Sequence, residues 1–275
     1  MSALGSPQRP LVLGMHVDHA EFDQAAEAIA RWVTEAGNPV QSGAAAGSSG
    51  SQRMICAANV HMVMEARDDA AFQQVVNSAD LVVADGQPMV WALRLQGVPQ
   101  QRRVRVSPNL IVRLLTEGER RGWRLGLYGG SDETLPVFLA ALARDYPRLA
   151  VPFAWAPPFR PLTSAEDDEV VVRIREAGVQ LLLVGLGCPK QERWMVAHRD
   201  RLPCVMMGVG AAFDLLGGRT KEAPRWTHGI GLEWAFRLAQ EPRRLWRRHL
   251  KHDPRFLTLL AREVVRRRMG RSSVG

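Results

Sequence analysis

The sequence is poor in cysteine and has no long run of apolar residues. Its three cysteines (Cys56, Cys188 and Cys204) are an odd number without close pairing, which excludes a disulfide scaffold and is typical of the reducing cytoplasm. No apolar run approaches the roughly 20 residues that cross a bilayer. Residues 1–10 lack the basic and apolar regions of a signal peptide. We therefore expect neither a secreted protein nor an integral membrane protein.

Several common ligand-binding motifs are also missing. The chain contains no Asp-x-Asp, which is the usual means of holding a divalent metal against a diphosphate. It has no Gly-x-Gly-x-x-Gly, Walker A or Gly-x-Ser-x-Gly sequence either. His16 and His19 lack the cysteine or carboxylate partners of a zinc site, and His61 and His198 are isolated in the sequence. We expect no metal and no cofactor.

The composition is that of an ordinary globular protein, but the charge is unevenly distributed. The 275 residues are 46% hydrophobic and 23% charged, with a net charge of +8. Residues 219–275 hold 15 Lys/Arg against 5 Asp/Glu, a net of +10, so the first 218 residues hold 21 against 23, a net of −2. Such a basic segment favours an anionic partner, and composition leaves nucleic acid, a phospholipid surface and a phosphorylated substrate open.

Short apolar segments alternate with segments of helical spacing through most of the chain. The segments that we predict as strands are 11–17, 54–58, 81–84, 124–128, 149–155, 180–184 and 204–207. This alternation predicts a Rossmann-like α/β domain over residues 1–218, with a mostly parallel sheet covered by helices on both faces. The small residues of 38–52 predict a flexible loop. Residues 219–275 predict a helical appendage rich in Arg and Trp.

Polar or glycine-rich turns follow several of the predicted strands. They are Asn59, Asp85-Gly86, Gly129-Gly130, Gly185 with Gly187, and Gly208 with Gly210. Ligands of open α/β sheets bind at the carboxyl ends of the strands. Glycine there lets the backbone approach a phosphate, and the N-terminus of the next helix favours negative charge. Each turn alone is weak evidence of a site, because a glycine after a strand usually serves only to reverse the chain.

Asp85 is the acidic residue best placed for catalysis. It lies between an apolar strand and a helix, where a carboxylate can act as a general base. The local pattern alone slightly favours the other interpretation, in which Asp85 merely caps the following helix. Both interpretations are open at this point.

The most informative segment runs from residue 185 to residue 256. It contains, in order, Gly-Leu-Gly-Cys-Pro-Lys-Gln-Glu-Arg-Trp, Gly-Val-Gly-Ala-Ala-Phe-Asp, Ala-Pro-Arg-Trp, Gly-Leu-Glu-Trp and the arginine pairs 243–244 and 247–248. Asn59, the Ser-Ala-Asp-Leu-Val-Val-Ala-Asp-Gly of 78–86 and the Leu-Gly-Leu-Tyr-Gly-Gly of 125–130 precede it. This ordered series closely resembles the WecG/TagA/CpsF family of bacterial glycosyltransferases over roughly residues 11–256.

The resemblance implies an enzyme of lipid-linked polysaccharide synthesis. Members of the family transfer N-acetylmannosamine, its uronic acid or a related hexose from a UDP donor to an undecaprenyl-diphosphate-linked saccharide. The transfer inverts the anomeric centre and needs no metal, which agrees with the missing Asp-x-Asp. The expected location is peripheral, at the cytoplasmic face of the cell membrane. The basic segment then has the membrane surface as its partner, and no nucleic acid.

The resemblance also implies roles for individual residues. Asp85 becomes the catalytic base, and Gln191 is placed in the catalytic pocket. The residues implied in donor binding are Asn59, Arg103, Arg105, Gly129, Gly130, Gly185, Gly187, Lys190 and Gly210. Those implied in binding the acceptor diphosphate are Arg237, Arg244 and Arg247, on an appendage of about residues 219–268.

Two positions depart from the family pattern. Ala57 stands where the family often has Thr, which removes a hydroxyl and bears on donor choice. The region 102–110 differs from the family's Arg-Val-x-Gly-x-Asp, with Pro108 and Asn109 where the family keeps its acid. The spacing leaves either Arg103 or Arg105 as the residue that meets the diphosphate.

Two other interpretations compete with the glycosyltransferase. One is a basic nucleic-acid-binding protein whose arginine tail follows phosphates, although the sequence has no nucleic-acid-binding motif. The other is an inactive scaffold of the same fold, favoured by Ala57 and opposed by the presence of Asn59, Asp85 and Gln191. A homo-oligomer is also compatible with a helical tail rich in Trp.

Overall fold

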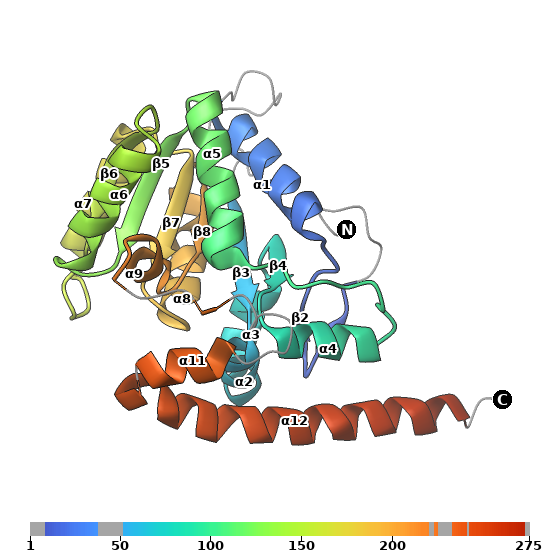
Figure 1. Ribbon diagram of the computed structural model, residues 1–275. Helices are drawn as coiled ribbons and strands as arrows, with labels where there is room; N and C mark the ends of the chain where they lie inside the picture. Colours follow the sequence, from blue (N-terminus) through green and yellow to red (C-terminus); the bar gives the residue numbers. More distant parts are fainter. Residues whose placement is uncertain (1–8, 38–51, 220–222, 225–232, 241, 273–275) are drawn as a thin grey trace.

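The core of the protein is a six-stranded parallel sheet (Figure 1). The computed structural model describes residues 9–37, 52–219, 223–224, 233–240 and 242–272. The strands lie in the order β4-β3-β8-β7-β5-β6. Their bounds are β3 Arg53–Ala58, β4 Leu81–Ala84, β5 Arg124–Gly129, β6 Ala150–Trp155, β7 Leu181–Gly185 and β8 Val205–Gly208. The predicted α/β architecture is therefore confirmed.

Helices connect the strands and cover both faces of the sheet. Those before β5 are α1 Phe22–Gly37, α2 Val60–Asp68, α3 Ala70–Asn77, α4 Gln87–Leu95, the short turn η1 Val106–Leu110 and α5 Ile111–Arg121. Those after β5 are α6 Thr134–Asp145, α7 Ser164–Glu176, α8 Lys190–His198, the turn η2 Arg199–Arg201 and α9 Ala212–Leu216. The three cysteines are free thiols.

Alternation of side chains along each strand divides the core into two layers. In β3, Met54 and Cys56 face one apolar cluster and Ile55 faces the other. The first cluster packs against α2, α3, α4, α7 and α8, and the second against α1, α5, α6 and α9. A strand that is apolar on both sides is typical of a parallel sheet between helical layers, which explains the near-continuous apolar runs of the sequence.

The segment before α1 differs from its prediction. In place of one strand over 11–17, the chain forms the antiparallel pair β1 (Leu11–Val12) and β2 (Met15–His16). Leu13 and Gly14 take positive φ angles of 51° and 93° and reverse the chain between them. The segment therefore forms a short hairpin with a two-residue turn. A pattern of hydrophobicity alone does not distinguish such a hairpin from a single strand.

One helix begins with a reciprocal cap. Helix α7 is capped by Thr163. The Thr163 hydroxyl accepts the backbone N–H of Glu166, and the Glu166 carboxylate accepts the backbone N–H of Thr163 in return. This reciprocal pair satisfies two backbone donors at the start of the helix.

The described residues of the basic end are helical from residue 233 onward. Helix α11 spans Glu233–Gln240 and helix α12 spans Pro242–Ser272. Figure 1 shows α12 as a long helix beneath α2, and the two helices are in contact. Phe256 and Leu260 of α12 are buried in the same apolar cluster as α2 and α3. Among the described helices, none is both long enough and apolar enough to span a bilayer. The loop predicted over 38–52 lies, except for its last residue, outside the described residues.

Candidate active site

The connections that leave the neighbouring strands β5 and β7 run to opposite sides of the sheet, which opens a crevice between the two strand ends. The strand β5 is followed by its outer neighbour β6, whereas β7 is followed by β8 on the other side. Gly129 and Gly185 end these two strands and are in register. A Cβ on Gly129 would lie only 2.5 Å from the carbonyl carbon of Gly185. Only glycine permits this approach, so the two predicted turns meet at the position where open α/β sheets bind ligands.

The adjoining turns keep their backbone accessible. The N–H of Gly130 donates to the carbonyl oxygen of Gly185 at 3.2 Å, which ties the β5 turn to the β7 turn. At Gly187 and Gly210 an added Cβ would meet no atom of the described residues within 4 Å. These two turns therefore present backbone that a ligand can approach closely, as the sequence predicts. Lys190, at the first position of α8, is exposed nearby in the chain.

Asn59 and Asp85 lie at the ends of adjacent strands. β3 and β4 pair in register, Ala58 beside Ala84, and the N–H of Asp85 donates to the carbonyl oxygen of Ala58 at 2.9 Å. An added Cβ on Gly86 would lie 3.6 Å from both Cα and Cβ of Asn59. Parallel pairing thus brings the predicted base and the predicted donor-binding asparagine together. The Asn59 side chain also caps α2 by accepting the N–H of Met62 at 3.1 Å.

The Asp85 carboxylate is held in position from the segment that follows α4. Its Oδ1 accepts the backbone N–H of Val106 at 3.0 Å. Arg103 donates from Nε to the Asp85 carbonyl oxygen at 2.5 Å, and its Nη2 lies 3.9 Å from Oδ1. The N-cap of α4 is Gly86, which makes no side-chain cap bond. The carboxylate therefore faces η1 and does not cap the helix.

Arg103 and Arg105, the two arginines that the sequence offers for binding the diphosphate, lie in different environments. Arg103 contacts Asp85, while Arg105 is half-buried and precedes the turn η1. Hence Arg103 is the arginine that contacts the candidate base directly, through its backbone carbonyl oxygen and its carboxylate. Which of them meets a diphosphate stays a prediction.

Gln191 is buried and links two of the glycine turns to the first turn of α8. Its Oε1 accepts the N–H of Gly210 at 3.0 Å, and its Nε2 donates to Oε1 of Glu192 at 2.7 Å. Its own N–H donates to the carbonyl oxygen of Gly187. The sequence did not single out Glu192, which is completely buried. That burial raises the pKa of the Glu192 carboxyl, against smaller opposing effects from hydrogen bonds of Gln191 and Cys188.

The predicted acceptor-binding arginines belong to the appendage. Arg237 falls within α11, and Arg244 and Arg247 fall within α12. Their side chains lie outside the part of the chain that the structure describes. Their role therefore stays a prediction.

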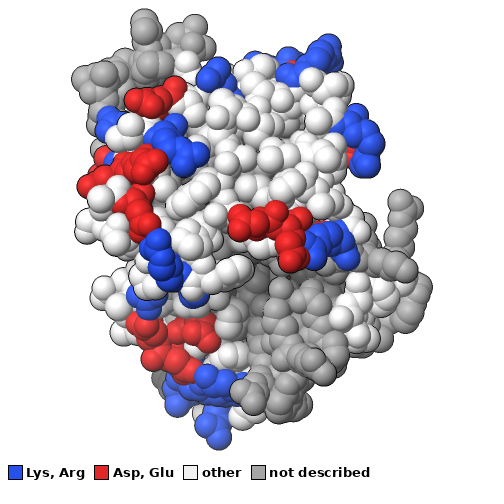
Figure 2. All heavy atoms as spheres, turned by 90° about the vertical axis from the view of Figure 1, so that its left-hand side faces the viewer, with Lys and Arg blue, Asp and Glu red and all other residues white. Residues whose placement is uncertain are grey.

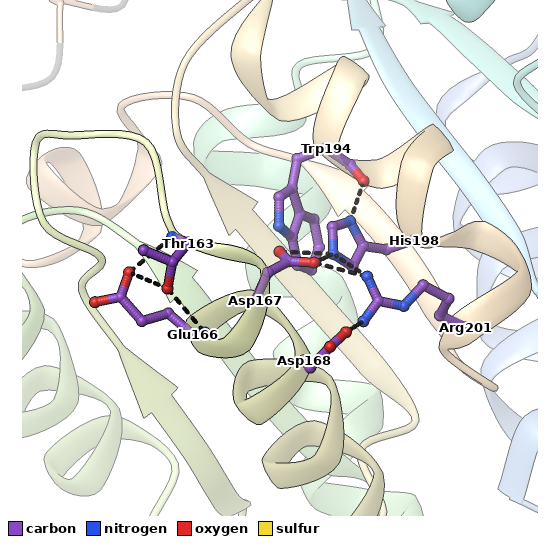
Figure 3. A network of polar contacts seen from close by, with 7 residues as sticks. All are labelled: Thr163, Glu166, Asp167, Asp168, Trp194, His198 and Arg201. Carbon is purple, nitrogen blue, oxygen red and sulfur yellow. Dashed lines mark hydrogen bonds and ion pairs between the residues drawn. The ribbon is translucent and has the colours of Figure 1, made fainter.

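A second polar network lies between α7 and α8, and Figure 3 shows how its residues converge. His198 is buried, donates from Nε2 to the Asp167 carboxylate at 2.9 Å, and stacks on Trp194 at 4.0 Å between ring centroids. Arg201 binds Asp167 and Asp168, each at 2.6 Å. This network joins two helices of one layer and supports the helix that carries Gln191. These contacts give His198 a structural role between the two helices.

Charges on the face that includes α6 and α7 are mixed in sign (Figure 2). Basic side chains there are paired with acidic ones, as in Arg160 with Glu166 at 2.6 Å and Arg144 with Asp145 at 2.7 Å. On this face acidic and basic groups intermingle, and no single-sign stripe of the kind that follows a phosphate backbone is visible. The net positive charge of the chain resides in the appendage instead.

The fold is that of an α/β protein whose parallel sheet carries a carboxylate, an amide and glycine turns at the carboxyl ends of its strands. The chain belongs to the glycosyl transferase WecG/TagA/CpsF family, whose model matches residues 11–270. It is a glycosyltransferase by family, as its sequence motifs indicate.

Characterised relatives carry one shared name. The chain is 29% identical over 205 residues, 74% of its length and 77% of the relative's, to a Bacillus spizizenii N-acetylglucosaminyldiphosphoundecaprenol N-acetyl-beta-D-mannosaminyltransferase. It is 30% identical over 218 residues, 79% of its length and 83% of the relative's, to the enzyme of that name from Staphylococcus aureus strain MW2. The enzyme of strain NCTC 8325 matches to the same extent.

Proposed function

We propose that this chain is an inverting, metal-independent glycosyltransferase. It moves N-acetylmannosamine, its uronic acid or a related hexose from a UDP donor to an undecaprenyl-diphosphate-linked saccharide in cell-surface polysaccharide synthesis. The observation that carries the proposal is the placement of Asp85 beside Asn59 at the edge of the sheet, with its carboxylate oriented by Val106. The names of the relatives support the same donor sugar and acceptor lipid.

In this mechanism Asp85 is the general base. Its carboxylate takes the proton of the attacking hydroxyl of the acceptor sugar as that oxygen forms a bond to the anomeric carbon. The bond from the anomeric carbon to the diphosphate breaks on the opposite face, and UDP leaves with the electron pair. A single displacement of this kind inverts the anomeric centre. The N–H of Val106 on Oδ1 fixes the carboxylate, so that little reorientation is needed during the transfer.

The donor occupies the crevice lined by the glycine turns. The turns at Gly187 and Gly210 have room for an approaching phosphate, and exposed Lys190 opens α8, whose N-terminus favours negative charge. Arg103 and Arg105 supply positive charge on the other side, close to the base. Positive groups stabilise the charge that develops on the departing diphosphate.

The outer face of α12 supports docking on the membrane. Leu257, Val265 and Met269 are 52%, 52% and 62% exposed, and they follow one another at multiples of four residues, so they form one apolar line. Arg262 and Arg266 are exposed beside that line. An amphipathic helix with basic flanks lies in the plane of an anionic membrane surface, where each basic side chain contributes about 1 kcal/mol. The enzyme then works at the cytoplasmic face, where its lipid-linked acceptor is found.

A panel of UDP-sugars tests this proposal. The chain is incubated with each donor and a short-tailed lipid-diphosphate-sugar acceptor in the presence of EDTA, and UDP binding is measured in parallel by calorimetry. Product from an N-acetylmannosamine-type donor that survives chelation is the expected result. UDP binding without turnover from any donor would indicate an inactive scaffold. If the chain neither forms product nor binds UDP, the glycosyltransferase proposal is rejected. The next assay would then be nucleic-acid binding by the appendage.

A further inference from the structure

Two potential metal ligands lie on one face of α2. His61 and Glu65 are four residues apart, which places both side chains on the same side of the helix. The Nδ1 of His61 lies 3.8 Å from Oε1 of Glu65. Both side chains are partly buried, with exposed fractions of 16% and 31%.

A third ligand comes from the appendage. His252 of α12 lies with its Nε2 3.5 Å from the same Glu65 oxygen, and its side chain is only 4% exposed. The rings of His61 and His252 meet edge to face, with their centroids 5.3 Å apart. One ligand atom from each of the three residues lies within 4.8 Å of the other two. Residues 187 positions apart in the chain thus converge on one point.

The donor set fits a divalent transition metal. Two imidazole nitrogens and a carboxylate oxygen are ligands that Zn²⁺ binds at about 2.0–2.2 Å, in tetrahedral geometry. Ligand atoms of such a site are separated by about 3.3–3.5 Å, as those bond lengths require. The separations of 3.5 and 3.8 Å to Glu65 are close to this spacing, so small side-chain rotations bring all three atoms within reach of one ion. The exposed part of Glu65 leaves the fourth position to water.

Packing around the cluster holds the ligands in place. Phe256 lies one turn beyond His252 and is completely buried in the main core. Arg255 binds Asp68 at 2.6 Å across the same pair of helices. That contact ties α12 to α2 beside the cluster, and a metal ion at the cluster would face the Glu65 carboxylate. The helices therefore present the three ligands on a framework that is already packed.

We propose that His61, Glu65 and His252 form a binding site for Zn²⁺ that fastens α12 to α2. The helix α2 is capped by Asn59, which follows β3 beside the end of β4 and Asp85, so the ion fixes the appendage relative to the edge of the sheet where the candidate base lies. The ligands lie on α2 and α12, whereas the base follows β4, and the ion is a structural fastener outside the transfer reaction. This inference does not depend on the proposed function.

Metal titration of the tag-free chain tests the site. The protein is treated with EDTA, desalted and titrated with Co²⁺, whose visible absorption reports tetrahedral nitrogen and oxygen ligation, and then with Zn²⁺ as competitor. We expect one equivalent of Co²⁺, displacement by Zn²⁺, and a Tm that rises with Zn²⁺ concentration, since binding to the folded state alone stabilises it. Glu65→Gln and His61→Gln should each weaken binding at least about tenfold, the lower end of the losses seen when a metal site loses a supporting group.

His16→Gln is the matched control, because His16 is a half-buried histidine outside the cluster. It should bind Co²⁺ as the wild type does. His252→Gln removes a buried side chain and can disrupt the packing between α12 and α2. Glu65→Gln changes the more exposed ligand, so its effect on Co²⁺ affinity can be measured in a folded protein. Absence of a stoichiometric Co²⁺ complex would overturn the proposal. So would unchanged affinity in folded Glu65→Gln and His61→Gln, which would reduce the cluster to a polar contact between helices.

Discussion

The guanidinium of Arg103 holds Asp85 at two points, donating to its backbone carbonyl oxygen and lying 3.9 Å from its carboxylate Oδ1. The side chains of both residues are mostly buried, with exposed fractions of 17% and 23%. A charge pair with limited access to water is screened less than one on the surface. Arg103 thus both positions the candidate base and places positive charge beside it.

Arg103→Gln should lower transfer by about ten- to a hundredfold in kcat/KM, the range expected when the alignment of a catalytic group is disturbed. The glutamine retains some polarity but loses the charge and the two-point contact. Initial rates at several donor concentrations measure the effect. Arg102→Gln is the control, because Arg102 is the exposed neighbour; equal loss in both variants would show that only local charge matters.

Gly129→Ala should destabilise the fold more than a change at an unconfined glycine does. Its Cβ would lie 2.5 Å from the carbonyl carbon of Gly185, and its φ of 128° is unfavourable for alanine. Gly122 has a φ of 69° with no described atom within 4 Å of an added Cβ. Gly122→Ala should therefore cost only about 1–2 kcal/mol of unfolding free energy from backbone strain. Urea unfolding of both variants isolates the steric part, and equal losses would contradict the close approach of the two strands.

Glu192 should make the stability of the protein fall as the pH rises. Burial raises the pKa of its carboxyl above the ordinary value of 4.5. The folded state therefore binds this proton more tightly than the unfolded state, and its contribution is fully present below pH 4.5 and is lost as the pH rises through the folded pKa. Glu192→Gln should flatten this slope when urea unfolding is measured at a series of pH values from pH 4 upward.

Glu166 provides a comparison of opposite sign. The Arg160 guanidinium and the N–H of Thr163 lower the pKa of this exposed carboxyl to about 2. Its contribution is present above pH 4.5 and is lost as the pH falls through the folded pKa. Glu166→Gln should change stability at neutral pH and leave intact the fall in stability above pH 4.5 that is assigned to Glu192. A slope that persists in Glu192→Gln would mean that another group causes it.

The apolar line on α12 should control binding to anionic vesicles. Changing Leu257, Val265 and Met269 together to Gln should weaken co-sedimentation with phosphatidylglycerol vesicles by at least about tenfold, since three exposed side chains lose their burial in the interface. The matched triple variant changes Leu95, Val137 and Val172, which are similarly exposed on other helices. Equal loss in the two triple variants would show that α12 is not the docking face.

The sequence predicts which residues follow the strands because the geometry of parallel sheets is regular. The carboxyl ends of neighbouring strands meet at one edge, so a polar residue after each of two apolar segments predicts the meeting of Asn59 and Asp85. The glycine turns at Gly129 and Gly185 follow from the same rule. Their close approach depends on strand order, which the pattern of hydrophobicity does not encode.

Other contacts depend on packing between distant segments. The sequence contains the spacing of His61 and Glu65 on one helical face, but nothing local indicates that His252 joins them from α12. Glu192 reads as a polar helix residue, and only the depth of α8 in the fold makes it buried. The sequence is compatible with either Arg103 or Arg105 as the arginine of the site. The path of the chain into η1 places Arg103 in contact with Asp85.

The central claim is that Asp85 is the base, and comparison of Asp85→Asn with Asp200→Asn tests it most directly. Asp200 is an exposed aspartate of η2 and serves as the matched control. With the productive donor, the account predicts that kcat falls at least about a hundredfold in Asp85→Asn, the scale of a lost general base, while UDP binding and the activity of Asp200→Asn stay near wild type. A kcat for Asp85→Asn within a few-fold of wild type would contradict the mechanism.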